Sequence, residues 1–221
     1  MKALVVGGGG REHALAWGLS KSPAVKELWT TSKNAGIDQL ACFAGRIDGS
    51  ASELADWAEL EGIDLTVVGP EAALAEGIVD EFRTRGLAIV GPTRKAAELE
   101  SSKAFAKELM VRAAIPTARF EVCSSAAHAR RVVRRLGAPV VVKADGLAAG
   151  KGVTVCPTIA EADACIAAIM EDRLFGDAGE RVVIEECLFG TEVSVLAFVS
   201  GKDVIVMPTS QDHKAARDGD Q

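Results

Sequence analysis

The first hundred residues repeat one pattern, in which a short apolar run is followed by a helical pattern. The apolar runs are 3–6, 28–31, 65–68 and 87–90, and the helical patterns cover about 11–21, 51–61, 74–85 and 94–112. This alternation is typical of βαβ units, which form a parallel sheet covered by helices on both faces. Glycines end three of these runs, at Gly7, Gly69 and Gly91, and place permissive turns at the sheet edge where such folds bind ligands.

The pattern changes after residues 115–116 to shorter connections between strands. We predict strands at about 118–122, 139–144, 152–156 and 181–186, helices at about 124–136 and 158–171, and a final hairpin of 192–199 with 203–207. This order is α+β in character, with neighbouring strands antiparallel, so a domain boundary is expected near 100–117. The hairpin is apolar on both faces, and nothing after Met207 could cover them, which predicts that the chain is a fragment.

Composition excludes several classes of protein. The formal net charge of -6 over 221 residues gives no footprint for nucleic acid or an anionic membrane, and we interpret the arginines of 130–135 as a solvated helix face. Five cysteines without a C-x-x-C pair indicate reduced thiols, with Cys156 and Cys187 in the core. No signal peptide or membrane-length apolar run is seen, so the sequence predicts a cytoplasmic protein.

Glycines follow the first apolar run in Val5-Val6-Gly-Gly-Gly-Gly-Arg-Glu-His. A strand, a glycine turn and a helix start form an anion site, because backbone N–H groups and the helix dipole face the ligand. The dinucleotide fingerprint fails, since its third glycine would fall on Glu12 or His13, and NAD is disfavoured. Arg11, Glu12 and His13 suit a small phosphorylated ligand with hydroxyl groups, and Glu71 lies on the same edge. A tight turn without a ligand is the alternative.

A second glycine-rich stretch, VVVKADGLAAGKGVTV, covers 140–155. It is no Walker A loop, because Gly146 and Gly150 are one residue too close and a strand follows. We interpret it as a hairpin tip that closes over a ligand, with Lys143 and Lys151 suited to a triphosphate. A plain surface hairpin is the alternative.

The third stretch is VVIEECLFGTE, at 182–192. An apolar strand that ends in Glu185 and Glu186 and resumes after a glycine is typical of the hinge strand of a nucleotide pocket. Backbone groups there could read adenine, and Glu192 could hold ribose hydroxyls. Surface acids at a strand end are the alternative.

Seven collinear motifs give the chain a resemblance to the ATP-grasp superfamily, and within it to the phosphoribosylamine–glycine ligase family of purine biosynthesis. They are GGREHAL (9–15), GPE (69–71), GP-x-x-x-A-A-x-L-E-x-SK-x-F (91–105), IPTA (115–118), VKADGLAAGKGV (142–153), VIEE-x-L-x-G-x-E-x-S (183–194) and SQDHK (210–214). The resemblance implies a ligase that phosphorylates glycine with ATP and transfers the glycyl group to 5-phosphoribosylamine. It needs no nucleophilic side chain, because rate comes from positioning, charge neutralisation and exclusion of water.

The resemblance also implies domains and site residues. The domains are an N-terminal substrate-binding domain (1–102), a linker (103–117), a small ATP-grasp lid subdomain (118–189) and an incomplete large subdomain (190–221). The implied ATP site comprises Lys103, Lys143, Asp145, Gly146, Gly150, Lys151, Gly152, Glu185, Glu186, Cys187, Leu188 and Glu192. The implied phosphoribosylamine site comprises Gly8, Gly9, Gly10, Arg11, Glu12, His13, Gly69, Pro70 and Glu71, and Asp212, His213 and Lys214 are expected near the reacting carboxylate.

The sequence departs from the family pattern in two places. Ser32-Lys33-Asn34-Ala35-Gly36 stands where the family shows P-G-N-x-G, and Ala215 replaces an arginine. The Mg²⁺ ligands are expected beyond residue 221, so the isolated piece is predicted to be inactive. The expected partners are small molecules bound by a monomer or weak oligomer, with neither nucleic acid nor membrane. Another ATP-grasp ligase and a non-catalytic nucleotide-binding module remain open as alternatives.

Overall fold

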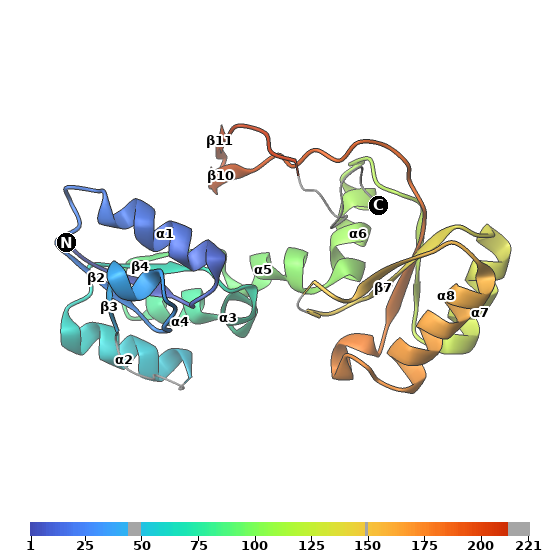
Figure 1. Ribbon diagram of the computed structural model, residues 1–221, viewed down its shortest axis with the longest axis horizontal. Helices are drawn as coiled ribbons and strands as arrows, with labels where there is room; N and C mark the ends of the chain where they lie inside the picture. Colours follow the sequence, from blue (N-terminus) through green and yellow to red (C-terminus); the bar gives the residue numbers. More distant parts are fainter. Residues whose placement is uncertain (44–49, 149, 212–221) are drawn as a thin grey trace. The chain divides into compact units, whose positions relative to one another are not determined.

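The computed structural model describes residues 1–43, 50–148 and 150–211 (Figure 1). The chain forms two compact units, Met1–Glu186 and Cys187–Gln221, which are treated separately below. The first unit contains two β-sheets and the second contains a β-hairpin.

The N-terminal sheet is parallel, in the order β3-β2-β1-β4-β5, which confirms the prediction from the βαβ pattern. Its strands are β1 (Lys2–Val6), β2 (Glu27–Thr30), β3 (Cys42–Phe43), β4 (Leu65–Val68) and β5 (Ile89–Val90). The sequence pattern missed β3, because a two-residue strand has no periodicity to detect.

Helices cover both faces of this sheet, as Figure 1 shows for α1 and α2. They are α1 (Gly10–Ser20), α2 (Ala51–Glu61), α3 (Glu71–Glu76) and α4 (Ile78–Thr84), with a short 3₁₀ turn at Ile37–Gln39. Alternate residues of β1 serve the two cores: Ala3 and Val5 pack in the core that contains Ala16 of α1, whereas Leu4 and Val6 pack in the core with α2 and α4. A strand buried on both faces must be apolar at every position, which explains the unbroken first run.

Two predicted helices are each divided in two. The helix predicted at 74–85 breaks at Gly77, whose φ of 92° ends α3, and α4 follows directly. The helix predicted at 94–112 becomes α5 (Arg94–Ser101) and α6 (Lys103–Arg112). The prediction of one helix was wrong because Ser102 is extended, and its side chain accepts a hydrogen bond from the Phe105 N–H as the N-cap of α6.

The second sheet is antiparallel, in the order β6-β9-β7-β8, as predicted for residues after 117. Its strands are β6 (Phe120–Cys123), β7 (Val140–Ala144), β8 (Val153–Cys156) and β9 (Val182–Glu186). One face is covered by α7 (Ala126–Leu136) and by α8 (Ile159–Ile166), which continues into a π-helical turn (Ala167–Glu171); a 3₁₀ turn at Gly176–Gly179 precedes β9.

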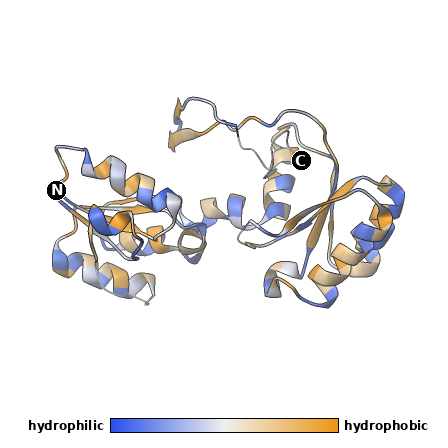
Figure 2. Ribbon diagram, in the orientation of Figure 1, coloured by the Kyte–Doolittle hydropathy of each residue, from blue (hydrophilic) through white to orange (hydrophobic). Residues whose placement is uncertain are grey.

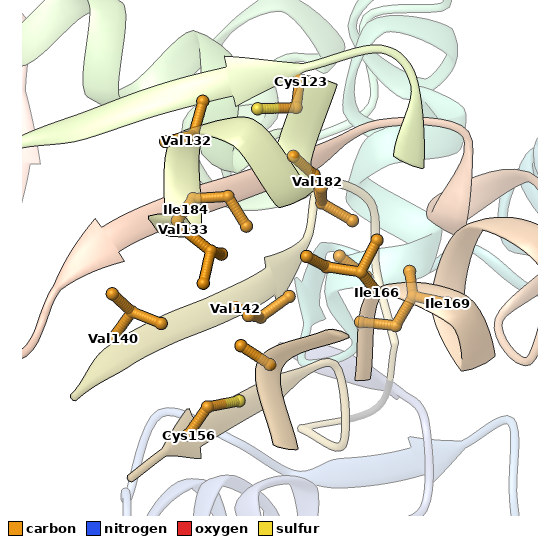
Figure 3. Packing of buried hydrophobic residues seen from close by; sticks show 13 residues of the cluster. Cys123, Val132, Val133, Val140, Val142, Cys156, Ile166, Ile169, Val182 and Ile184 are labelled. Carbon is orange, nitrogen blue, oxygen red and sulfur yellow. The ribbon is translucent and has the colours of Figure 1, made fainter. Parts of the chain in front are cut away.

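Side-chain alternation assigns the two faces of this sheet. Val140 and Val142 of β7 and Val182 and Ile184 of β9 point into the core with the helices (Figure 3). The intervening residues of β7 and β9, which include Lys143 and Glu185, therefore share the opposite face. Figure 2 shows the strands of both sheets to be mainly hydrophobic.

The arginines of α7 make ion pairs on the domain surface, in agreement with a solvated helix face. Arg130 binds Glu171, Arg134 binds Asp163, and Arg135 binds Glu121 of β6. Each pair joins α7 to another element.

All five cysteines are free thiols. Cys156 is buried as predicted, but Cys187 is only half-buried, so the prediction that it belongs to the core was wrong. It directly follows the last residue of β9.

The second unit contains β10 (Ala197–Ser200) and β11 (Asp203–Val206), which form the predicted antiparallel hairpin with a shorter first strand. Every side chain of β10 and β11 is exposed. Among the helices of the described ranges, none has the length and apolar character needed to cross a membrane.

Candidate functional site

A cavity of about 350 Å³ lies in the first unit, over the face of the second sheet that the helices α7 and α8 leave uncovered. It contains equal numbers of basic and acidic side chains together with an apolar portion. The basic residues are Lys103, Lys107 and Lys143, the acidic residues are Glu71, Glu100 and Glu185, and the remainder are Leu99, Ala106, Met110, Leu147, Ala148, Gly150, Gly152 and Val153. Three ammonium groups beside an apolar surface suit a ligand with an anionic end and a flat apolar end.

Glu185 is the centre of the charged network in this cavity. Its side chain is almost completely buried, and its Oε2 lies 2.9 Å from Nζ of Lys143 and 3.0 Å from Nζ of Lys107. The strand register explains the first contact: Val141 is opposite Glu185, and Lys143 is two residues further along β7 on the same face. A buried carboxylate is thus held by two cations.

Lys103 begins α6 and lies beside the hairpin loop. Its Nζ donates to the Gly146 carbonyl oxygen over 3.0 Å, and its backbone N–H donates to the Asp145 carbonyl oxygen over 3.1 Å. Desolvation lowers the pKa of Lys103, opposed mainly by the nearby negative charge of Asp145. A partly desolvated ammonium group gains more from an anionic ligand than an exposed one does, because it has less hydration to lose.

Asp145 was predicted to contact the nucleotide, but its side chain is occupied by protein. Its Oδ1 accepts hydrogen bonds from the Ala104 N–H (2.7 Å) and the Ser102 hydroxyl (3.1 Å), and its Oδ2 pairs with Arg181 (2.5 Å). The contacts are those of an anchor that ties the start of α6 to the end of β7. Asp145 is not among the residues that line the cavity.

The glycine-rich hairpin predicted between Lys143 and Val153 is confirmed by the antiparallel pairing of β7 with β8. Gly146 donates its N–H to the Ala178 carbonyl oxygen, and an added Cβ there would lie 2.8 Å from the Ala178 Cβ. Gly150 and Gly152 line the cavity, whereas Lys151 is exposed and does not. Ala149 lies outside the described residues.

The glycine turn after β1 is tightly connected to the neighbouring strand ends. The Gly9 N–H donates to Glu12 Oε2 over 2.5 Å, which leaves Glu12 buried beneath the turn. Arg11 donates to the Gly69 carbonyl oxygen over 2.7 Å and lies 3.3 Å from Glu71. Glu12 therefore organises the turn, whereas Gly9, Gly10 and Arg11 remain exposed at its edge.

Asn34 is the residue of the departing SKNAG segment that joins the turn. Its amide donates to the Gly8 carbonyl oxygen over 2.8 Å, and its Oδ1 accepts from the N–H groups of Gly36 and Ile37. His13 packs directly over Gly36, where an added Cβ would overlap the imidazole. The asparagine and glycine shared with the family pattern therefore shape the turn. Of the two departing positions, Ser32 packs against Gly8, where an added Cβ would lie 2.6 Å from the Ser32 Cβ.

A second cavity, of about 300 Å³, adjoins this turn. It is lined by Arg11, Glu71, Leu74, Pro92, Ala97 and Glu100. Glu71 and Glu100 line both cavities, so the two spaces are adjacent. Adjacent cavities are therefore lined by Arg11 and Glu71, which were predicted at the sheet edge, and by Lys143, which was predicted beside the loop.

The other predicted site residues are placed as follows. Pro70 is the N-cap of α3, and Glu186, at the end of β9, binds the backbone N–H and side chain of Arg119, which lowers the pKa of Glu186. Cys187, Leu188 and Glu192 belong to the second unit and are described only within it. Asp212, His213 and Lys214 lie outside the described residues.

The sequence analysis assigned neither Lys107 nor Glu100 to a site. Lys107 is four residues after Lys103, so a helical reading of 94–112 already placed both lysines on one face, which was the available signal. Glu100 lies near the end of α5, and its presence in the quoted motif at 91–105 was the available signal. No cluster of three or more potential metal-ligating side chains occurs among the residues that the structure describes.

These two sheets, with a glycine turn on one and a lysine-lined cavity on the other, define a protein with an ATP-grasp domain preceded by a parallel-sheet domain. The family models agree over the whole chain: residues 1–100 match the phosphoribosylglycinamide synthetase N domain, and residues 101–221 match its ATP-grasp (A) domain. The chain belongs to the phosphoribosylglycinamide synthetase family.

The relatives carry the corresponding name. The chain is 54% identical to a phosphoribosylamine–glycine ligase of Ralstonia nicotianae and 49% identical to that of Escherichia coli, in each case over 100% of this chain and 52% of the relative. A crystal structure of phosphoribosylamine–glycine ligase from Thermotoga maritima has a TM-score of 0.77 and 30% identity, covering 100% of this chain and 52% of that one. The chain therefore spans about half the length of the relatives it matches.

Proposed function

We propose that the chain is the nucleotide- and amine-binding part of a ligase that joins glycine to 5-phosphoribosylamine at the expense of ATP. The products would be glycinamide ribonucleotide, ADP and phosphate. The observation that carries the proposal is the adjacency of the two cavities, one with three lysines and one with Arg11, which share Glu71 and Glu100. A ligase that uses ATP must hold two anionic substrates next to each other.

The cavity over the second sheet would bind ATP. Lys103 and Lys143 would contact its phosphates, since both are ammonium groups that line the cavity. The apolar part, with Leu99, Met110 and Leu147, suits the adenine ring. Glu185, Glu186, Cys187 and Leu188 are proposed for the adenine side and Glu192 for the ribose, with Gly146, Gly150, Lys151 and Gly152 in the loop that covers the phosphates.

The cavity at the glycine turn would bind phosphoribosylamine. Backbone N–H groups at the start of α1 and the guanidinium of Arg11 favour its phosphate, whereas Glu71 is suited to its hydroxyl or amino groups. Gly8 to His13 and Gly69 to Glu71 would form this site as predicted. This cavity and the lysine-lined cavity share Glu71 and Glu100, so the two proposed binding sites are adjacent.

The proposed reaction proceeds through glycyl phosphate. The glycine carboxylate attacks the terminal phosphoryl group of ATP, and the amine of phosphoribosylamine then displaces phosphate from the acyl carbon. The side chains of this chain would act by position and charge, and the loop at 145–152 would exclude water from the acyl phosphate. Asp212, His213 and Lys214 are proposed near the reacting carboxylate.

Mg²⁺ is expected with the nucleotide, where it would neutralise phosphate charge. The described residues offer no cluster of ligands for it, and no step is assigned to the ion. We propose that its ligands lie beyond residue 221. The division of the chain into 1–102, a linker at 103–117, 118–189 and 190–221 is part of the same proposal.

Binding of ADP by the 221-residue chain, followed by calorimetry, tests the nucleotide site. Lys143→Gln should weaken ADP binding about tenfold, because a charge-assisted contact to phosphate is lost. Lys95→Gln, an exposed lysine of α5, is the matched control and should leave the affinity unchanged. Equal ADP affinity in wild type and Lys143→Gln would remove the basis for the proposal.

A test of the substrates requires a longer chain, in which these 221 residues are joined to the part of the family's length that they do not cover. ADP release should then depend on both glycine and phosphoribosylamine. Release that depends on bicarbonate in place of glycine would favour another ATP-grasp ligase, whereas ADP binding without turnover would favour a non-catalytic nucleotide-binding module.

A further inference from the structure

Arg181 lies beside the root of the glycine-rich loop, which is formed by Asp145 and Gly146 directly after β7. Half of the arginine side chain is exposed, and its Nη2 lies 2.5 Å from Asp145 Oδ2. The Arg181 carbonyl oxygen also accepts the Asp145 N–H over 3.1 Å. Arg181 is not among the residues that line the lysine-containing cavity, and the proposed reaction gives it no task.

The 3₁₀ turn at Gly176–Gly179 supports the second residue of the root. The Ala178 carbonyl oxygen accepts the Gly146 N–H over 3.2 Å, and an added Cβ at Gly146 would lie 2.8 Å from the Ala178 Cβ. The turn is packed against the helical layer, since an added Cβ at Gly179 would lie 2.4 Å from the carbonyl oxygen of the buried Ile169. The root of the loop therefore rests on backbone that is fixed to the core of the domain.

The root in turn places Lys103 at the start of α6. Asp145 Oδ1 accepts the Ala104 N–H over 2.7 Å and the Ser102 hydroxyl over 3.1 Å, so the carboxylate satisfies donors at the helix start. The Asp145 carbonyl oxygen accepts the backbone N–H of Lys103 over 3.1 Å. The Gly146 carbonyl oxygen accepts from Nζ of Lys103 over 3.0 Å, so both ends of this lysine are held by the root.

These contacts form a chain from Arg181 through Asp145 to Lys103. The arginine holds one oxygen of the carboxylate, and α6 holds the other. A buried carboxylate that loses the partner of one oxygen is costly and attracts any nearby cation. Desolvation lowers the pKa of Lys103, and the charge of Asp145 is the largest opposing effect, so the two groups already interact. Without Arg181, the carboxylate would draw Lys103 away from an anionic ligand.

We propose that Arg181 is a positioning residue for the phosphate end of the nucleotide, because it holds Asp145 and thereby keeps the ammonium group of Lys103 in the cavity. The inference rests on the proposed ATP site. An ammonium group has three N–H donors, and in the described part of the chain Gly146 accepts the one hydrogen bond that Lys103 Nζ makes. Two donors stay available for phosphate oxygens. Arg181 should therefore affect the binding of phosphate and leave the binding of base and ribose unchanged.

Four variants separate positioning from general support of the fold. Arg181→Met removes the charge and keeps an unbranched side chain, and Arg181→Gln is the milder change should Arg181→Met unfold. Arg181→Lys keeps a cation beside Asp145. Arg134→Met is the matched control, because Arg134 is 56% exposed, against 50% for Arg181, and pairs with Asp163 of α8 over 3.0 Å. Circular dichroism establishes that each variant is folded.

The measured quantity is the ratio of the dissociation constants for adenosine and ADP, obtained by calorimetry on the 221-residue chain, with adenosine measured by displacement of ADP. Adenosine keeps the base and the ribose but lacks the phosphates. We expect Arg181→Met to lower this ratio about fivefold, through weaker ADP binding alone, since a charge-assisted contact to phosphate is weakened. Arg181→Gln should lower it about threefold, and Arg181→Lys should stay within about twofold of wild type. Arg134→Met should keep the wild-type ratio.

A double-mutant cycle with Asp145→Asn shows whether Arg181 acts through Asp145. Asp145→Asn alone should lower the ratio, because the carboxylate oxygen that pairs with the arginine is lost. Adding Arg181→Met to Asp145→Asn should then change the ratio by less than about twofold. An arginine that acted only through the long-range attraction of its charge would lower the ratio about fivefold in both backgrounds, which would contradict the proposal.

The remaining outcomes separate this inference from the proposed function. If folded Arg181→Met and Arg181→Gln keep the wild-type ratio, Arg181 does not position Lys103, although the nucleotide site stands. If adenosine and ADP weaken equally, Arg181 only supports the fold. If the wild-type chain binds neither compound, or binds both with equal affinity, the proposed function and this inference fail together.

Discussion

Asp145 joins the two elements that carry the lysines of the cavity over the second sheet, so its removal tests the architecture of that cavity. The change is Asp145→Ala. In the structure Oδ1 accepts from the Ala104 N–H and the Ser102 hydroxyl, and Oδ2 pairs with Arg181. Asp145 is 6% exposed and Ala104 is 1% exposed, so the N–H of Ala104 would be left buried without an acceptor.

The magnitude follows from these contacts. A buried donor left without a partner costs about 1–3 kcal/mol, and the lost serine contact adds about 1 kcal/mol. The Arg181 pair adds at most about 1 kcal/mol, because half of the arginine side chain is exposed. A total of about 3 kcal/mol lowers the unfolding midpoint of a protein of this size by about 6–12 °C.

Thermal unfolding followed by circular dichroism measures this change. Asp145→Asn keeps an oxygen for the Ala104 N–H and loses the charge and the second acceptor oxygen that pairs with Arg181, so its midpoint should fall about a third as far. Asp172→Ala changes an exposed aspartate of the same domain and should leave the midpoint unaltered. A midpoint for Asp145→Ala within about 1 °C of wild type, or equal effects of the alanine and asparagine variants, would refute the reasoning.

Two further predictions concern the glycine turn and the response to acid. Gly69→Ala should destabilise the chain by about 2 kcal/mol, because the new Cβ would overlap the carboxylate of Glu12; Gly18→Ala, where nothing lies within 4 Å, is the control that should be neutral or stabilising in a denaturant titration. The hydrogen bond from Arg135 lowers the pKa of Glu121 in the folded state, so its stabilisation is full above the ordinary pKa of about 4.5 and is lost as the pH falls through the lowered value. Arg135→Gln should therefore make the unfolding midpoint less dependent on pH below about 4.5, and an unchanged acid dependence would contradict the assignment.

Sequence periodicity was sufficient for much of the fold. Apolar runs with intervening helices predicted the parallel sheet, and the strand-like runs on either side of the glycine-rich stretch predicted the hairpin of β7 and β8. Breaks inside helical patterns were harder to detect, because Ser102 and Gly77 interrupt apolar spacing that otherwise continues. Cap residues and positive φ angles act over one or two residues, which is below the window that periodicity needs.

The sequence by itself determined the list of candidate groups: the glycine turns, Lys103, Lys143, Glu185 and the charged residues at the strand ends. Only the tertiary structure decided their tasks, because pairing across strands and between α6 and the sheet cannot be read from spacing along the chain. In the structure, Asp145 and Glu12 accept hydrogen bonds from backbone N–H groups of the chain itself, and one oxygen of Glu185 contacts two lysines. Short-range order along a chain follows local energetics, whereas the assignment of a buried charge to its partners depends on which distant segments pack together.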